Sequence, residues 1–474
     1  MDITHIGPTP RVYGTEFEYG MIVSGSESVP EHFFSYLPHG MGGSLQYRKN
    51  GSRIYPDVGH AEYATPECGT LGDMVAAELA GEEIFIATLQ RLAGGNAQAS
   101  YRLHKRNIDQ AGNSYGAHES YCVDHSIRFD DVPSSRKNYL VQALAIHYVS
   151  RIALVGGGYY NRDTGRWRVS QRTAQLRLLT DGVCNGVERK PLVDTRNEAL
   201  ADLSRYRRLH VSHGDPNVSS WALRTKIGMT SAFLRLLEAG VPMEHLFLRD
   251  PLQAAYQVGA DTSLSAKLEL HDGRRMTALE LQETIAEKIL AMADTRLVPL
   301  DELAVAEEVY AASGHATKDL DALMYKTDWY TRQQLVEEKA VRSKYGGSIK
   351  DRLAGLDQMY DAIVCKLPGS EPVAGIGKRL RDEKGKFGPV DHAAVKRLQS
   401  SPPTSSRALL RGKLIQAAAV PDIKQRYGIP IVGWDYIKFS TSPELKFTLD
   451  DPTQTKPDQA MRRLFWQAGI SLAA

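Results

Sequence analysis

Strand-like segments gather at the start of this 474-residue chain, and helical segments fill its middle. Residues 11–24 alternate and are rich in Val, Tyr, Phe and Ile, which predicts a strand. Further strands are expected over 43–47, 52–64 and 101–105, and helices over 73–93, 135–155, 219–239, 277–296, 300–312 and 318–364. This segregation favours an α+β fold, an antiparallel β-sheet cradle packed with helices, because parallel sheets need alternating strands and helices.

The chain changes character after residue 365. Residues 366–400 are polar, charged and contain Gly and Pro, which predicts a linker or a mobile loop. A short helix, the strand-like GIPIVGWDYIKFS and a last helix follow Pro402-Pro403. We therefore expect a main domain over 1–400 and a small C-terminal α/β domain over 401–474.

Composition argues against several classes of protein. The 58 basic and 56 acidic residues give a formal charge of +2, whereas a general nucleic-acid binder would carry a large basic excess. No apolar run approaches the roughly 20 residues of a membrane helix, and the first residues do not resemble a secretory signal. Four scattered cysteines without a CxxC pair are typical of reduced thiols in a cytoplasmic protein: Cys68, Cys122, Cys184 and Cys365.

The segment Glu16-Phe17-Glu18 places two carboxylates on one face of the first predicted strand, because residues i and i+2 point the same way. Two neighbouring carboxylates repel each other unless a cation or a proton lies between them. Magnesium takes oxygen ligands and leaves room for nucleotide phosphates. The alternative is the solvated outer face of an edge strand, on which such a pair is common.

A second acidic stretch lies in residues 50–68. Within eleven residues it holds Asp57, His60, Glu62 and Glu67, and Arg53 lies beside them. Carboxylates from this stretch that meet the first pair would form a multi-metal site, which phosphoryl transfer uses to neutralise charge. A charged hairpin is the alternative interpretation.

His118 and Glu119 follow a loop with glycines at 112 and 116. Adjacent strand residues face opposite ways, so we expect only one of the two to face a site, and we prefer His118. A single loop histidine is more often a satisfied polar residue than a ligand.

Several arginines could complement a metal–nucleotide site. In the stretch RRLHV, alternation places Arg208 and His210 on one face and Arg207 on the other. Arg172 and Arg196 are further candidates, since arginine clamps phosphates and carboxylates, although most surface arginines only solubilise a protein.

Known catalytic motifs of other classes are missing. The chain has no GxxxxGK[ST] P-loop and no HExxH. If the protein uses ATP, it uses a carboxylate-rich sheet in place of a P-loop.

Together these stretches resemble the family of the Pup ligase and the depupylase. Those enzymes attach or remove the prokaryotic ubiquitin-like protein Pup and are similar to glutamine synthetase in their sheet. The matching stretches are GTEFEYG (14–20), NGSRIYPDVGHAEYATPEC (50–68), HKRNIDQAGNSYGAHESY (104–121), SQR (170–172), DTRNE (194–198), YRRLHVSHGDPN (206–217), TDW (327–329) and PPTSSRALLRGK (402–413). They run in family order over nearly the whole chain.

The resemblance implies a role for each element. Magnesium would be held at the ATP phosphates by Glu16, Glu18, Glu62, Glu67 and His118. Asp57 matches the catalytic aspartate, which in the ligase takes a proton from the attacking lysine amine. The resemblance further implies a set of nucleotide- or substrate-binding residues: Arg53, Tyr55, Arg172, Arg196, Arg208, His210 and Trp434. The tryptophan is the weakest of these, because its sequence context is also typical of the core.

The activity implied is that of an ATP- and Mg²⁺-dependent carboxylate–amine ligase. It would activate a carboxylate, the C-terminal Glu of Pup or a related peptide or amino acid, as an acyl phosphate and join it to an amine such as lysine. A depupylase-type amide hydrolase that uses ATP as a cofactor and a catalytically silent protein-binding paralogue are the alternatives. Depupylases carry a long loop after the first strand, and only residues 21–49 separate that strand from the next motif here.

The interval from Asp57 to Glu62 is one residue shorter than in the ligase and closer to the spacing in the depupylase. Other departures from the family pattern leave the donor open: the family's K-N-N-T-D is KRNID at 105–109. The expected partners are thus a carboxylate donor and an amine acceptor, with neither nucleic acid nor membrane.

Overall fold

The computed structural model describes residues 11–24, 33–37, 46–109, 112–130, 132–182, 189–343 and 346–471. Among these residues, eight strands form a sheet in the order β11–β6–β1–β4–β3–β2, with β5 paired to β1 and β14 paired to β5. The strands are β1 (Tyr13–Val23), β2 (Gln46–Tyr47), β3 (Arg53–Asp57), β4 (His60–Ala64), β5 (Tyr101–His104), β6 (Ala117–Asp124), β11 (Tyr206–Val211) and β14 (Ala362–Lys366). All of these pairings are antiparallel, so the predicted α+β class is confirmed.

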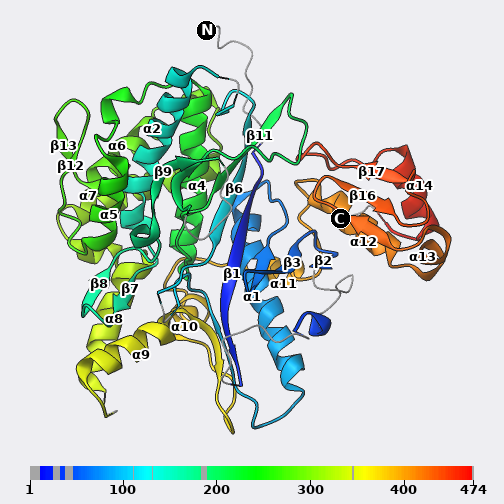
Figure 1. The fold of residues 1–474 in the computed structure, drawn as a ribbon, viewed down its shortest axis with the longest axis horizontal. Helices are drawn as coiled ribbons and strands as arrows, with labels where there is room; N and C mark the ends of the chain where they lie inside the picture. Colours follow the sequence, from blue (N-terminus) through cyan, green and yellow to red (C-terminus); the bar gives the residue numbers. More distant parts are fainter. Residues whose placement is uncertain are drawn as a thin grey trace.

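Strand β1 runs through the centre of the molecule (Figure 1). Its odd-numbered residues Phe17 and Tyr19 are buried, and the Tyr19 ring lies 4.6 Å from that of Phe85 on α1 (Leu71–Ala93). Its even-numbered residues Glu16 and Glu18 therefore project from the other face. Helix α1 begins after the cap residue Thr70 and ends at Gly94, whose φ of 57° suits glycine.

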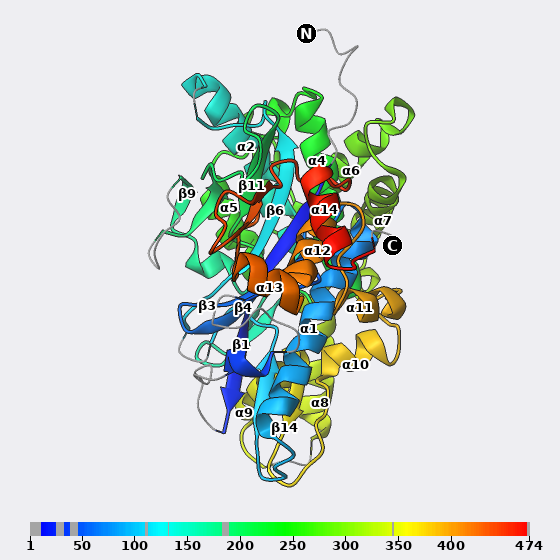
Figure 2. The same ribbon diagram turned by 90° about the vertical axis from the view of Figure 1, so that its right-hand side faces the viewer.

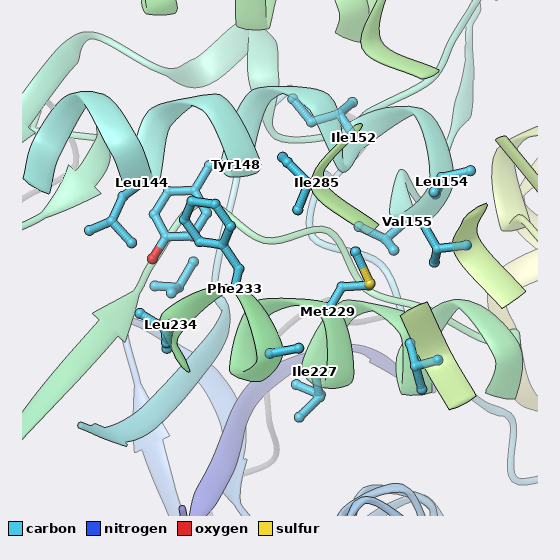
Figure 3. Close-up of a cluster of buried hydrophobic side chains, with 14 of the residues drawn as sticks. Leu144, Tyr148, Ile152, Leu154, Val155, Ile227, Met229, Phe233, Leu234 and Ile285 are labelled. Carbon is cyan, nitrogen blue, oxygen red and sulfur yellow. The ribbon is translucent and has the colours of Figure 1, made fainter. Parts of the chain in front are cut away.

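A layer of helices covers one face of the sheet at β1, β6 and β11, the face to which the odd-numbered residues of these strands point. Its helices are α2 (Ser134–Ser150), α3 (Ile152–Val155), α4 (Ser220–Glu238), α5 (Pro251–Ala260), α6 (Ala278–Leu290) and α7 (Leu300–Ala316). Figure 3 shows Tyr148 of α2 beside Phe233 of α4, within a buried cluster that includes Tyr121 and Leu209 of the sheet. The hydrophobic core thus fixes one face of the sheet and leaves the opposite face for polar side chains.

The C-terminal elements pack around a hydrophobic cluster of their own. They are α12 (Ala408–Ala418), α13 (Pro421–Tyr427), β15 (Pro430–Val432), β16 (Tyr436–Phe439), β17 (Lys446–Thr448) and α14 (Gln459–Gln467). Figures 1 and 2 show them together on one side of the molecule. The domain boundary at residue 400 stays a prediction.

The segment 366–400 differs from the linker or mobile loop that we expected. It contains α10 (Ile376–Asp382) and α11 (His392–Leu398), and Leu398 is fully buried. Arg381 of α10 is also buried and lies 2.6 Å from Glu82 of α1. The sequence of this segment is typical of a solvent-exposed loop because the residues that pair with its charges are distant in the chain and cannot be identified from the sequence.

The remaining helices lie at the lower end of the sheet in Figure 1. They are α8 (Asp328–Arg342) and α9 (Ile349–Asp361), and β14 follows α9 directly. The helical stretch expected over 318–364 consists of a short 3-10 helix (Leu320–Leu323) followed by α8 and α9 as separate helices, and its last three residues belong to β14.

No described helix is long and apolar enough to cross a membrane. Cys68, Cys122 and Cys365 are buried and free, as predicted, and Cys184 lies outside the described residues.

Candidate active site

Three carboxylates meet on the polar face of the sheet. Glu18 of β1, Asp57 of β3 and Glu62 of β4 each offer an oxygen, and these oxygens lie within 4.8 Å of one another. The sheet register explains this, because Glu18 lies directly opposite Glu62 on the neighbouring antiparallel strand. The backbone N–H of Gly116 donates a hydrogen bond of 2.7 Å to Glu18 Oε1 and orients that carboxylate.

A tight turn places Asp57 at the edge of this cluster. Val58 and Gly59 form the tip of the β3–β4 hairpin with φ values of 42° and 88°. Two successive positive φ angles suit the right-handed twist of a two-residue hairpin, although a β-branched residue rarely adopts one. Asp57 consequently lies opposite His60, at the open end of the hairpin.

The electrostatics of this cluster favour a bound cation. Burial raises the pKa of Glu62 well above its usual value, and the charges of Glu16 and Glu18 raise it further. Burial and Glu18 also raise the pKa of Asp57. Carboxylates that repel one another in this way are the oxygen-rich donor set that Mg²⁺ takes, so the residues fit the metal that the sequence predicts.

A second cluster lies beside the first, further back along β1. Glu16, His118 of β6 and His210 of β11 also offer ligand atoms within 4.8 Å of one another. Arg208 Nη2 lies 3.0 Å from Glu16 Oε1, and His118 Nδ1 lies 3.6 Å from Glu16 Oε2. Although burial opposes it, Arg208 holds the pKa of Glu16 below its usual value. Burial and Arg208 lower the pKa of His210 well below its usual value, so its ring is a neutral ligand or acceptor at neutral pH.

The alternation expected for β6 and β11 is present. Glu119 points away from the site and pairs with Arg151 at 2.8 Å in the core, whereas His118 faces Glu16. Arg207 likewise turns away and donates to the backbone carbonyls of its own segment, whereas Arg208 reaches Glu16.

Glu67 is not brought into either carboxylate cluster, contrary to its expected place among the metal ligands. It pairs with Arg407 at 2.8 Å and with Arg411. Although burial opposes it, these two guanidinium groups lower the pKa of Glu67 to about 2. Its oxygens are therefore already neutralised, and in this structure the residue ties the sheet to α12.

Trp434 lies close to that ion-paired group. The Arg411 guanidinium lies 4.6 Å from the centre of its ring, and the Tyr47 ring lies edge-on at 5.5 Å. Trp434 also lines a cavity of about 100 Å³, together with Tyr13, Glu16 and residues of β6 and β11. This cavity opens beside the Glu16 cluster, so the tryptophan contributes to the wall of the site.

The other expected binding residues surround the clusters. The Arg53 guanidinium lies 4.3 Å from the centre of the Tyr55 ring, and Tyr55 is hydrogen-bonded to Glu62. Arg196 lies 3.7 Å from Glu198 at the rim, and its charge contributes to lowering the pKa of His210.

A larger cavity of about 520 Å³ lies at the opposite end of β1. His60 and Tyr115 line it, with their rings stacked at 4.1 Å, and its far wall comes from α9. Tyr115 was not among the predicted site residues, because nothing in the local sequence shows that its ring meets the hairpin of Asp57.

The comparisons with known proteins agree with this geometry. A family model described as "Pup-ligase protein" matches residues 43–438. The chain belongs to the Pup-ligase family. A Pup–protein ligase of Acidimicrobium ferrooxidans is 34% identical, with 96% of this chain and 98% of the relative covered. One of Jonesia denitrificans is 31% identical, with 94% and 95% covered.

Two solved structures are similar over most of their length. A complex between Pup and its ligase PafA superposes with a TM-score of 0.79 at 26% identity, covering 97% of this chain and 92% of the other. The Pup ligase PafA in complex with ADP gives a TM-score of 0.73 at 27% identity, with 90% of each chain covered. The ligase branch of the predicted family is thereby confirmed.

Proposed function

We propose that this protein is an ATP- and Mg²⁺-dependent ligase that joins the C-terminal glutamate of a Pup-like donor to a lysine amine. The single observation that carries the proposal is the pair of clusters on one face of the sheet, one of Glu18, Asp57 and Glu62 and the other of Glu16, His118 and His210. The family membership and the relatives named Pup–protein ligase support the same activity.

The nucleotide belongs at the Glu16 end of the site. The cavity beside Glu16 is lined by Tyr13, Tyr206 and Trp434, which offer apolar surface to a base, and Arg208 lies on the path towards the carboxylates. Use of a nucleotide is supported by the relative that was solved with ADP. Arg208 and neutral His210 are placed to bind phosphate oxygens.

Glu18 and Glu62, with Glu16 and His118, are the residues that would hold magnesium. Bound there, the metal would neutralise the charge that builds up on the phosphates during transfer. The pKa of Glu62 is raised because these carboxylates repel each other, and a cation relieves that repulsion.

The donor carboxylate is activated first. One of its oxygens attacks the γ-phosphorus of ATP; the new O–P bond forms as the bond between that phosphorus and the leaving ADP oxygen breaks. A carboxylate is a poor electrophile, and the resulting acyl phosphate carries a good leaving group.

The amine then attacks the acyl carbon. A lysine ammonium has a pKa of about 10.4 in solution, so it must lose a proton before its nitrogen can attack. The Asp57 carboxylate accepts this proton, and its raised pKa makes it a stronger base than an exposed aspartate. The C–N bond forms, the C–O bond to phosphate breaks, and the second surplus proton on nitrogen leaves with the phosphate.

Mass spectrometry tests the proposal. The protein is incubated with Mg-ATP, a Pup-type peptide ending in Glu and a lysine-bearing acceptor. We expect a conjugate lighter by one water than its two components, with one ADP formed per conjugate. A peptide ending in Ala is the matched control and should give neither product. Absence of both ADP and conjugate with the glutamate peptide would overturn the proposal.

A further inference from the structure

Two buried cations, Arg172 and Lys190, lie beside the site. Arg172 and Lys190 are 7% and 9% exposed, and neither forms a salt bridge within the described part of the chain. Arg172 donates to the hydroxyl of Ser114 and to the backbone carbonyl of Tyr115 at 3.3 Å. Lys190 Nζ lies 3.5 Å from the same Ser114 hydroxyl, so the two cations converge on one point.

This arrangement is costly unless an anion completes it. Burial lowers the pKa of Arg172, and the charges of Glu18 and Asp215 offset this only in part. Burial together with Arg172 and Arg177 lowers the pKa of Lys190 to about 8, and no acidic group is among the causes. The Nε of Arg172 is buried and has no hydrogen-bond partner among the described residues. Other buried arginines, such as Arg151 and Arg381, are each paired with a glutamate. An unpaired buried charge is strongly unfavourable, which indicates that a ligand supplies the missing anion.

The position of the cations decides which anion this is. Ser114 and Tyr115 belong to the loop that contains Gly116, and Gly116 holds the carboxylate of Glu18. Tyr115 also lines the 520 Å³ cavity at the far end of β1 from the cavity beside Glu16. The cations therefore lie near Glu18 and away from the cavity assigned to the nucleotide, and this position leaves them for the donor.

We propose that Arg172, Lys190 and Ser114 form a subsite for the non-reacting α-carboxylate of the donor's C-terminal glutamate. The inference rests on the proposed function. A C-terminal glutamate carries two carboxylates; the side-chain carboxylate extends to the catalytic clusters while the cations hold the other. Guanidinium and ammonium groups are suited to this task, the first as a fork of donors and the second as a point charge.

The subsite explains how the enzyme can require a terminal glutamate. A donor without the α-carboxylate leaves both cations buried and unpaired, and a site built to bind a polar group rejects an analogue that lacks it. Lys190 thereby becomes a specificity-determining residue that the sequence analysis did not select.

Two donor peptides test the inference: a Pup-type peptide ending in Glu with a free α-carboxylate, and the same peptide amidated there. For the wild-type protein we expect the amide to have a KM at least about tenfold higher. Lys190→Met should raise the KM of the free acid about tenfold to hundredfold, leave that of the amide unchanged and leave the KM of ATP unchanged. Lys190→Arg should restore most of the discrimination.

Arg177→Met is the matched control. This exposed arginine donates to the backbone carbonyls of Ala174 and Leu176. Its charge lowers the pKa of Lys190, but at pH 7 Lys190 is already mostly charged, so its loss should not alter discrimination between the two peptides there. Thermal unfolding of each variant shows whether it is folded.

Three results would overturn the inference: equal use of both peptides by the wild type, an equal rise in KM for both with Lys190→Met, or a rise in the KM of ATP instead. Equilibrium binding of fluorescent versions of the two peptides gives a readout that needs no catalysis. If no conjugate forms but the free acid still binds more tightly than the amide in a Lys190-dependent way, the proposed function fails and the subsite stands.

Discussion

Two groups of carboxylates in this molecule have opposite surroundings. On the polar face of the sheet, Glu18, Asp57 and Glu62 form no salt bridge to lysine or arginine within the described residues. On α1, Glu82 lies 2.9 Å from Lys105 and 2.6 Å from Arg381.

The pKa shifts record this difference. Burial acts to raise the pKa of Glu62 and of Glu82 alike, but the pKa of Glu62 is raised by neighbouring carboxylates and that of Glu82 is lowered by Arg381 and Lys105. Neighbouring charges, and not burial alone, therefore decide the sign. The ion-paired Glu82 stabilises the fold, whereas the group of Glu18, Asp57 and Glu62 is suited to a cation that binds with the ligands.

Among the predicted substitutions, Asp57→Asn in the catalytic group should have the largest effect. The amide keeps the shape of the side chain but accepts no proton from an ammonium, so we expect isopeptide formation to fall by about 10²–10⁴-fold. Binding of ATP should be retained, because Asp57 lies away from the cavity beside Glu16. Conjugate yield by mass spectrometry and nucleotide binding by calorimetry check the two halves; conjugation at the wild-type rate would show that another group is the base.

Glu82→Gln, in the ion-paired group on α1, should lower the free energy of unfolding. It leaves Lys105 and Arg381 buried with too little negative charge, and loss of one partner from a buried ion pair costs about 3–5 kcal/mol of unfolding free energy. Chemical denaturation measures this cost. Glu83→Gln is the matched control, because Glu83 is about one-third exposed and its pair with Lys378 contributes about 0–1 kcal/mol. Equal destabilisation by both substitutions would contradict the distinction between the groups.

The sequence was sufficient for the catalytic group because strand periodicity is a local property. Once Glu16-Phe17-Glu18 is recognised as part of a strand, the two glutamates must point to the same face of the sheet. The same alternation places His118 and Arg208 on the face that carries the site. The turn at Val58 and Gly59 brings the second acidic stretch back beside the first.

The structural group could not be predicted in this way, because its partners are distant in sequence. Arg381 meets Glu82 across 299 residues, and Arg411 meets Glu67 across 344. Glu67 was assigned to the metal for this reason: its acidic neighbourhood is visible in the sequence, and its arginine partners are not. Lys190 was overlooked because nothing in the sequence distinguishes it from a surface lysine.

Glu62→Gln should change the pH dependence of the free energy of unfolding. Since the pKa of Glu62 is raised in the folded state, the folded protein holds a proton that the unfolded chain loses above about pH 4.3, and wild-type stability falls as the pH rises from there. The variant lacks this loss. In the absence of Mg²⁺ we expect it to be more stable than the wild type by about 0.5–2 kcal/mol at pH 7, and equally stable below pH 4.

Denaturation series at both pH values measure this gap. Added Mg²⁺ should stabilise the wild type more than the variant, because the variant lacks one of the carboxylates that attract the ion. A variant less stable than the wild type at pH 7 without metal would show that Glu62 is satisfied within the protein.

The cations at Arg172 and Lys190 mirror the unpaired carboxylates, and they give the smallest expected effect. Lys190 has a pKa of about 8, and only its charged form attracts a carboxylate. Arg172 and Arg177 are the charged groups that act on it, and a guanidinium group does not lose its proton in proteins. The dissociation constant of the glutamate-ended peptide should therefore rise about fourfold between pH 7 and 8.5, as the charged fraction of Lys190 falls. Lys190→Arg should remove this pH dependence. Binding is measured by fluorescence anisotropy without acceptor and without ATP, so that the titration of the acceptor's lysine cannot contribute. A dependence that persists in Lys190→Arg would assign the titration to another group and would leave Lys190 outside the donor subsite.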